Sequence, residues 1–228
     1  MLPIGGRPLL EHTVDWLRSF GILDIAINLH YRGDVVTAHF GDGSGFGVRI
    51  TYSPEKTLAG TAGAVRKLDS YFQDVALIVY GDLLTNVDLR KLLEFHAERS
   101  LVSEAPVITL SLYEPPNPRD CGIVKINSEG RVLQMREKPR EEVLFSTLSF
   151  AGVMVLDRAV IDLIPPDTFC DFGYHVLPDA IQRDLPVYGL PIVEPEYVID
   201  IGTPERYARA CDEWPISTSR SELKEDSC

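Results

Sequence analysis

The sequence predicts a single α/β domain, and three observations lead to this prediction. Helix-like and strand-like patterns alternate through the first half of the chain. The segment 75–80 is continuously apolar, as in a strand that is buried on both faces of a sheet. The chain has 228 residues, of which 45% are hydrophobic, so it is long and apolar enough for one full core. This alternation favours a mostly parallel sheet with helices on both faces.

In the first half, apolar residues recur at helical spacing in several segments, with strand-like runs between them. The first expected helix carries Leu10, Val14 and Leu17 on one stripe, and Gly21 stops it. The glycine-rich segment 41–47 joins a helix to a strand and lacks the Lys-Ser/Thr ending of a P-loop, which favours a surface connection. The expected helices cover 7–20, 34–40, 61–68 and 88–99, and the expected strands cover 22–29, 48–52 and 75–80.

After Pro106 the strand-like runs follow one another closely, which indicates an antiparallel portion. A turn at 127–130 separates two of these runs. Thr203 is the expected N-cap of the last helix, with Pro204 at its first position. The expected strands cover 107–113, 122–127, 132–137 and 148–156, and the expected helices before the last one cover 157–164 and 174–183.

The end of the chain differs in character from the rest. Residues after Trp214 are polar and show no periodicity. We therefore expect one domain over 1–213 and a disordered tail over 214–228.

Composition narrows the classes of function. The net charge of −12 argues against a nucleic-acid partner, because no basic stripe is present to neutralise phosphates. No apolar stretch is long enough for a bilayer, and no signal-like segment is seen, so we expect a cytoplasmic protein without a membrane partner. The cysteines form no C-x-x-C pair and no histidines share metal-ligand spacing, which argues against zinc and redox motifs. A small phosphorylated substrate remains compatible with this charge if a divalent cation is bound.

Two apolar runs end in an aspartate. Asp82 follows the run 75–80 after Gly81, and Asp200 closes the run 197–199. The carboxyl ends of strands in an open α/β sheet are where ligands bind, and a carboxylate there commonly holds Mg²⁺ against a phosphate. The alternative is that each carboxylate caps a following turn or ends a strand in solvent. If both strands end at one edge, the two carboxylates converge on one cation.

Two further segments offer binding groups. Glu137 and Lys138 precede a proline and place a hydrogen-bond acceptor and a cation at a strand end. In 58–64, small residues let a flat ring approach the backbone, and N–H groups at a helix start meet an anion or a base edge. The alternatives are a solvated strand end for the first segment and tight helix-to-sheet packing for the second.

Taken in order, these segments resemble the sugar-phosphate nucleotidyltransferases. The stretches LAGTAGA, YGDLLTNVDL, REKP and IDIGTPERY carry the resemblance, which runs over about 1–210. It is closest to single-domain bacterial members that act on hexose or heptose 1-phosphates as guanylyl-, thymidylyl- or uridylyltransferases. The resemblance implies a Rossmann-like three-layer fold with a mixed central sheet. It also implies Mg²⁺ as cofactor and transfer of a nucleotidyl group from an NTP to a sugar 1-phosphate, giving an NDP-sugar and pyrophosphate.

The resemblance assigns roles to individual residues. It implies that Asp82 and Asp200 hold the metal, that Glu137 accepts hydrogen bonds from sugar hydroxyls, and that Lys138 binds the sugar phosphate. The implied catalytic residues are Asp82, Lys138 and Asp200. The implied nucleotide-binding residues are Leu58, Gly60, Thr61, Ala62, Gly63 and Gly81. The implied sugar-phosphate-binding residues are Gly122, Glu137, Lys138, Ala151 and Gly152.

The chain also departs from the family pattern. Residues 1–8 match the family just after its usual Gly-rich phosphate loop and Lys-Pro pair, so we expect the first strand and that loop to be missing. Such a strand would be central, and its loss is expected to expose backbone groups and apolar surface on its neighbours. Tyr80 stands where Asn is common, and Phe150 stands near a position where many relatives carry Asn.

Three hypotheses follow. The first is a nucleotidyltransferase whose true start lies upstream of Met1, with activity impaired in the truncated chain. The second is a non-catalytic regulatory homologue that binds a nucleotide sugar. The third is a glycosyltransferase that uses an NDP-sugar donor, although Asp82-Leu83-Leu84 offers one carboxylate instead of Asp-x-Asp. No hexapeptide repeat follows residue 210, which argues against an acyltransferase-fused relative. The nucleobase, the sugar and a homo-oligomeric state are left open.

Overall fold

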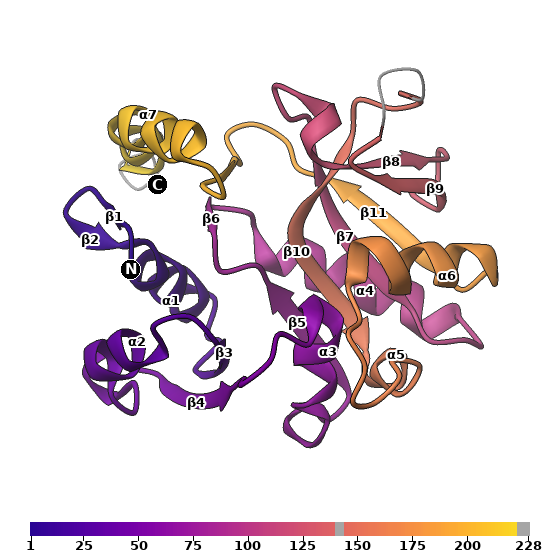
Figure 1. The fold of residues 1–228 in the computed structure, drawn as a ribbon. Helices are drawn as coiled ribbons and strands as arrows, with labels where there is room; N and C mark the ends of the chain where they lie inside the picture. The colour runs from indigo at the N-terminus through magenta and orange to yellow at the C-terminus, as the bar shows by residue number, and fades with distance from the viewer. Residues whose placement is uncertain (140–143, 223–228) are drawn as a thin grey trace.

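The computed structural model describes residues 1–139 and 144–222 (Figure 1). The first half alternates helices and strands, as the sequence pattern predicts. Its elements are β1 (Pro3–Ile4), β2 (Arg7–Pro8), α1 (Leu9–Ser19), β3 (Asp24–Leu29), α2 (Gly33–Phe40), β4 (Arg49–Pro54), α3 (Gly60–Arg66), β5 (Val75–Val79), β6 (Leu83–Thr85) and α4 (Leu89–Val102).

The second half is richer in strands. Its elements are β7 (Ile108–Tyr113), β8 (Gly122–Ile126), β9 (Val132–Glu137), β10 (Ser149–Asp157), α5 (Arg158–Asp162), the π-helical turn η5 (Phe172–Val176), α6 (Leu177–Gln182), β11 (Val187–Pro191), β12 (Val198–Asp200) and α7 (Pro204–Glu222). Thr203 caps α7, with the Arg206 N–H donating to its hydroxyl at 3.3 Å, which confirms the expected start of that helix. The short strands β1, β2, β6 and β11 are additions that the sequence pattern did not predict.

Strand β10 is the centre of a six-stranded sheet. It pairs antiparallel with β7 on both sides of a register shift and with β5 along its second half, and Ser149 pairs with Ile123 of β8 at its start. The register shifts between Phe150 and Met154, where Gly152 has φ +77°. This bulge lets one strand change neighbours from β8 to β5. It also places residues 151 and 152 beside the end of β5, where the Tyr80 N–H donates to the Gly152 carbonyl at 2.9 Å.

The sheet is covered on both faces, which gives three layers. Met154 and Leu156 of β10 face a core that also holds apolar side chains of α3, α5 and α6. Val153 and Val155 face the opposite core, formed with α1 and α4. The alternation follows from the two-residue repeat of a strand, and it explains why β10 is apolar throughout.

The first parallel pair stands apart from this sheet. β3 pairs with β4 in parallel register, and in the described part of the chain no strand pairing joins β3 to β5 (Figure 1). Ile25 and Ile50 of this pair enter the core that lies under α1. The expectation of a missing central strand stays a prediction.

One expectation about the sheet needs correction. The mixed sheet is confirmed, but the mostly parallel arrangement predicted from the first half is wrong for β5, whose partner β10 is antiparallel. The expected disordered tail over 214–228 stays a prediction, although α7 extends as far as Glu222. The remaining residues of the predicted tail, 223–228, lie outside the described residues.

The first and the last elements of the described chain lie side by side. Helix α7 lies beside the β1–β2 ribbon (Figure 1), and the Tyr207 hydroxyl donates to the Pro3 carbonyl at 2.7 Å. In the described residues, no helix combines the length and the apolar character needed to cross a membrane.

Candidate active site

Asp82 and Asp200 lie next to each other, one after β5 and the other at the end of β12. Strand β12 pairs antiparallel with β6, which sets Asp200 opposite Leu83. The Ile201 N–H donates to the Asp82 carbonyl at 2.9 Å and extends this pairing. A side chain on Gly202 would begin 2.9 Å from Asp200 Oδ1 and 3.4 Å from Asp82 Oδ2. Both carboxylates therefore face one small space, which stays open because residue 202 is glycine.

The proximity of the two carboxylates affects their protonation. Desolvation raises the pKa of the Asp82 carboxyl, the charge of Asp200 raises it further, and Arg206 opposes the shift. Asp82 is an exposed residue, although enough protein surrounds its carboxylate to desolvate it in part. Two neighbouring carboxylates that are partly desolvated require a nearby cation if both are to be ionised.

The donor set fits a hard divalent cation. Two carboxylates suit Mg²⁺, which takes oxygen ligands and keeps several waters. Among the described residues, no group of three or more His, Cys, Asp or Glu side chains forms a complete metal cage. A cation at Asp82 and Asp200 would thus leave positions for water or phosphate oxygens.

Glu137 is packed between two glycines. A side chain on Gly122 would begin 2.5 Å from Glu137 Oε2, and one on Gly173 would begin 2.7 Å from the same oxygen. Desolvation raises the pKa of Glu137, Lys138 lowers it, and Asp171 raises it. Both glycines leave room for this carboxylate, so it is a well-positioned acceptor.

Lys138 follows directly in an unusual backbone conformation. Its φ of +41° lies in the left-handed region, which a side chain disfavours. Its N–H donates to the Cys121 carbonyl at 3.1 Å, so the strand pairing of β8 and β9 ends at this residue. Glu137 and Lys138 thus stand at the same strand end, but the Glu137 residue is half-buried and Lys138 is exposed.

The segment 58–63 is tied to the segment before α6. Gly60 has φ +79°, and a Cβ there would lie 2.3 Å from the Cys170 carbonyl oxygen. The N–H groups of Ala62 and Gly63 both donate to that carbonyl at 3.0 Å. Tight packing, the alternative interpretation from sequence, therefore explains Gly60, Ala62 and Gly63. Leu58, in contrast, is 57% exposed and free to meet a ligand.

Asp171 is a functional candidate that the sequence interpretation missed. The Thr61 hydroxyl donates to Asp171 Oδ2 at 2.8 Å, and the N–H groups of Gly173 and Tyr174 bond to Asp171 Oδ1 at 2.8 and 3.2 Å. The available signal was an Asp just before a turn that enters a helix, which is an N-cap pattern. Arg206 was missed as well, although it follows the cap Thr203 by three residues.

Tyr80 lies between the two halves of this region. Its ring meets Phe150 edge-on at a centroid distance of 5.6 Å. Desolvation raises its pKa strongly, the hydrogen bond with Thr61 opposes this, and Asp171, Glu137 and Asp82 add to the rise. Tyr80 and Phe150, the two departures from the family pattern, thus contact each other. The charges of Asp82 and of Glu137 both raise the pKa of Tyr80.

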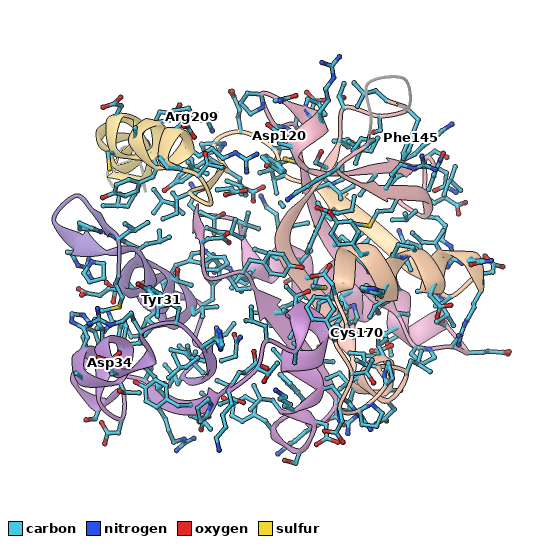
Figure 2. The ribbon with its side chains drawn as sticks, viewed as in Figure 1. Tyr31, Asp34, Asp120, Phe145, Cys170 and Arg209 are labelled. Atoms are coloured by element: carbon cyan, nitrogen blue, oxygen red, sulfur yellow. The ribbon has the colours of Figure 1, made fainter. Side chains whose placement is uncertain are left out.

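The remaining predicted residues lie at the same edge. Gly81 is exposed between Tyr80 and Asp82. Ala151 and Gly152 are buried at the β10 bulge, and a Cβ on Gly152 would lie 2.6 Å from Leu83 Cδ1. In Figure 2, Asp120 marks the β8 side of the region and Arg209 marks α7, while Cys170 lies lower, toward α3.

A cavity of about 450 Å³ borders the 58–63 segment on another side. Leu58, Gly63, Arg66 and Phe169 are among its lining residues, whereas Asp82, Asp200 and Glu137 are not. The carboxylates thus lie outside this cavity.

Comparisons with known proteins find similar sequences over most of the chain. A family model described as Nucleotidyl transferase matches residues 1–214. Mannose-1-phosphate guanylyltransferase of Mycobacterium tuberculosis is 33% identical over 215 residues, which cover 92% of this chain and 56% of that protein. D-glycero-alpha-D-manno-heptose 1-phosphate guanylyltransferase of Campylobacter jejuni is 26% identical over 211 residues, covering 91% of this chain and 86% of that protein.

The fold also has counterparts among solved structures. The crystal structure of HddC from Yersinia pseudotuberculosis superimposes with a TM-score of 0.76 at 24% identity, covering 94% of this chain and 88% of that one. At this identity the likeness shows the fold. The chain spans about half the length of the first curated relatives that it matches.

Proposed function

The chain belongs to the nucleotidyl transferase family, and from this premise we propose that it transfers a nucleotidyl group from an NTP to a sugar 1-phosphate. The products are an NDP-sugar and pyrophosphate. The proposed acceptors are hexose or heptose 1-phosphates, because the similar proteins are named for mannose and heptose 1-phosphates. The observation that carries the proposal is the convergence of Asp82 and Asp200 beside Gly202.

The proposed reaction is an in-line displacement. A phosphate oxygen of the sugar 1-phosphate forms a bond to the α-phosphorus of the NTP, and the bond from that phosphorus to the bridging oxygen of the β-phosphate breaks. Pyrophosphate leaves with the electron pair. Asp82 and Asp200 would hold Mg²⁺, which when bound supplies charge neutralisation to the phosphates. The protein forms no covalent bond, so positioning and electrostatics carry the rate.

The remaining residues bind and orient the two substrates. Glu137 accepts hydrogen bonds from sugar hydroxyls while Gly122 lets the sugar approach the backbone, and Lys138 pairs with the sugar phosphate. The segment 58–63 borders the nucleobase, with the exposed Leu58 against its ring. Ala151 and Gly152 close the sugar side next to Tyr80 and Phe150.

Pyrophosphate release tests this function directly. The chain is supplied with Mg²⁺, each NTP in turn and a panel of hexose and heptose 1-phosphates. Release that requires one NTP and one sugar phosphate, and that is lost in Asp82→Asn and Asp200→Asn, is the expected result. If the folded chain binds a nucleotide sugar but releases no pyrophosphate, the proposed transferase activity is wrong and a binding function takes its place. If the chain transfers the sugar of an NDP-sugar to an acceptor without any pyrophosphate, it is a glycosyltransferase instead.

A further inference from the structure

Arg206 forms an ion pair with one of the two carboxylates of the site. It stands in the first turn of α7, and its Nη1 donates to Asp200 Oδ2 at 2.6 Å. The other oxygen of Asp200 accepts from the Gly202 N–H, also at 2.6 Å. Each carboxylate oxygen of Asp200 therefore has a partner from the protein itself.

A second acidic residue lies on the far side of the guanidinium. Arg206 Nη2 is 3.6 Å from Asp120 Oδ2, and Asp120 ends the short turn Pro118–Asp120 that leads into β8. The side chains of Arg206 and Asp200 are 25% and 27% exposed, so their pair is only partly open to water. Arg206 thus bridges the end of β12 and the turn before Gly122.

Arg206 lies where a cation is needed to offset the charges of Asp82 and Asp200. Asp82 and Asp200 face one small space beside Gly202, and their mutual repulsion is relieved either by a bound divalent ion or by a side-chain cation. The guanidinium lies on Asp200 Oδ2, while Oδ1 lies beside the space at Gly202, so Arg206 already neutralises the carboxylate that such an ion would bind. Ion and guanidinium then compete for the same charge.

We propose that Arg206 is an internal counter-ion of Asp200 that competes with a divalent cation for the charge of this carboxylate, so that this residue sets the metal affinity of the site. The inference rests on the proposed function, because it takes Asp82 and Asp200 as the metal ligands. Arg206 is a positioning residue in this role. When a divalent cation weakens its pair with Asp200, the guanidinium still has Asp120 as a partner and presents N–H donors to the neighbourhood of the substrate phosphates.

Mn²⁺ binding to the full chain tests the inference without any turnover. Calorimetry or the electron paramagnetic resonance signal of free Mn²⁺ gives the Kd for the wild type, Arg206→Gln and Arg206→Lys. We expect Arg206→Gln to bind Mn²⁺ roughly threefold to tenfold more tightly, because the competing ion pair is gone. Arg206→Lys keeps a cation within reach and should fall between the two.

Arg209→Gln is the matched control. Arg209 lies in the same helix, pairs with Glu213 at 3.1 Å and carries the same charge, so its loss reports the effect of net charge alone. Its Mn²⁺ affinity should stay within about twofold of wild type. Equal gains in the Arg206 and Arg209 variants, or no gain in Arg206→Gln, would overturn the inference.

Thermal unfolding gives a second readout. Without metal, Arg206→Gln should melt below the wild type, and saturating Mn²⁺ should raise its Tm by more than it raises that of the wild type. A drop in Tm that Mn²⁺ leaves unchanged would mean that Arg206 only braces α7 against Asp120, which contradicts the proposal.

Failure of the proposed metal site has a different signature. If Asp82→Asn and Asp200→Asn bind Mn²⁺ as well as the wild type does, the metal ligands are wrong, and the inference falls together with them. If those variants lose Mn²⁺ while Arg206→Gln matches wild type, the metal site stands and the counter-ion role alone is overturned.

Discussion

Thr61 and Asp171 are joined by a hydrogen bond of 2.8 Å although 110 residues separate them. Asp171 also accepts the N–H groups that open the π-helical turn η5. The Phe172 N–H returns a bond to the Thr61 hydroxyl at 2.9 Å. The proposed nucleobase segment is thereby held against the segment that leads into α6.

This link predicts a coupled loss of stability. Thr61→Val and Asp171→Asn should each lower the free energy of unfolding by about 1–2 kcal/mol, because a partly buried hydrogen bond is left incomplete. A double-mutant cycle followed by urea denaturation should give a coupling of about 0.5–1.5 kcal/mol. Thr61→Ser keeps the hydroxyl and is the control. Purely additive effects would contradict a direct link.

Asp82 should make stability depend on pH in a defined direction. Its raised pKa means that the folded protein holds this proton more tightly than the unfolded chain does, so ionisation costs stability as pH rises from the usual Asp range through the raised value. Asp82→Asn removes this cost and should raise Tm at neutral pH by about 1–3 °C in metal-free buffer. The gain should vanish at pH values below the usual Asp range.

Asp34→Asn serves as the control for that experiment. The Asp34 side chain is 73% exposed on α2, far from the site in Figure 2. Its replacement should leave the pH profile of Tm unchanged. A lower Tm for Asp82→Asn at neutral pH would show that the Asp82 carboxylate is favourably paired even without a metal.

Glu137 should confer a pH dependence on sugar binding. Desolvation raises its pKa, with Lys138 opposing and Asp171 adding to the rise, so the carboxylate is lost at a higher pH than usual as the solution is acidified. The KM for the sugar 1-phosphate should therefore rise on the acid side. Glu137→Gln should raise KM by about 10-fold or more at neutral pH and remove that dependence. An unchanged acid-side KM profile in Glu137→Gln would mean that another group titrates.

Lys138 combines a proposed charge contact with a left-handed backbone at φ +41°. Lys138→Gly and Lys138→Ala both remove the cation and should raise the KM for sugar 1-phosphate equally. The glycine variant should be more stable than the alanine variant by about 1 kcal/mol, because glycine adopts this conformation without strain. Equal stabilities by chemical denaturation would contradict the strain, and unequal KM values would contradict the role of charge.

Gly60 should tolerate no side chain. A Cβ there would lie 2.3 Å from the Cys170 carbonyl oxygen, and its φ is +79°. Gly60→Ala should cost at least about 2 kcal/mol of stability and weaken NTP binding. Gly45→Ala is the control, since Gly45 is exposed with nothing within 4 Å of its Cβ position, and should change stability by at most about 0.5 kcal/mol. A mild Gly60→Ala phenotype would mean that the two segments separate easily.

Sequence patterns predicted most helices and the longer strands, because each of these carries a clear apolar period. The family was recognised from four short stretches, and the family match confirms it. The convergence of Asp82 and Asp200 followed from the expectation that strand ends meet at one edge, and β12 and β6 bring them together by antiparallel pairing.

Other features depend on contacts that no local pattern encodes. Strand β6 has three residues, too few to show a period, and β11 was missed between two turns. The role of Asp171 depends on Thr61, and that of Arg206 depends on Asp200 and Asp120. Such pairs become visible only when distant segments are placed side by side.

The separation of the β3–β4 pair from the six-stranded sheet has a consequence for temperature. The junction between them is made by apolar side chains such as Ile25, Ile50 and Val153, supported by the Lys67–Glu55 ion pair at 2.8 Å. Hydrophobic association weakens on cooling, whereas the hydrogen bonds between paired strands do not weaken in the same way. Cooling should therefore weaken this seam more than it weakens the strand pairing within either sheet.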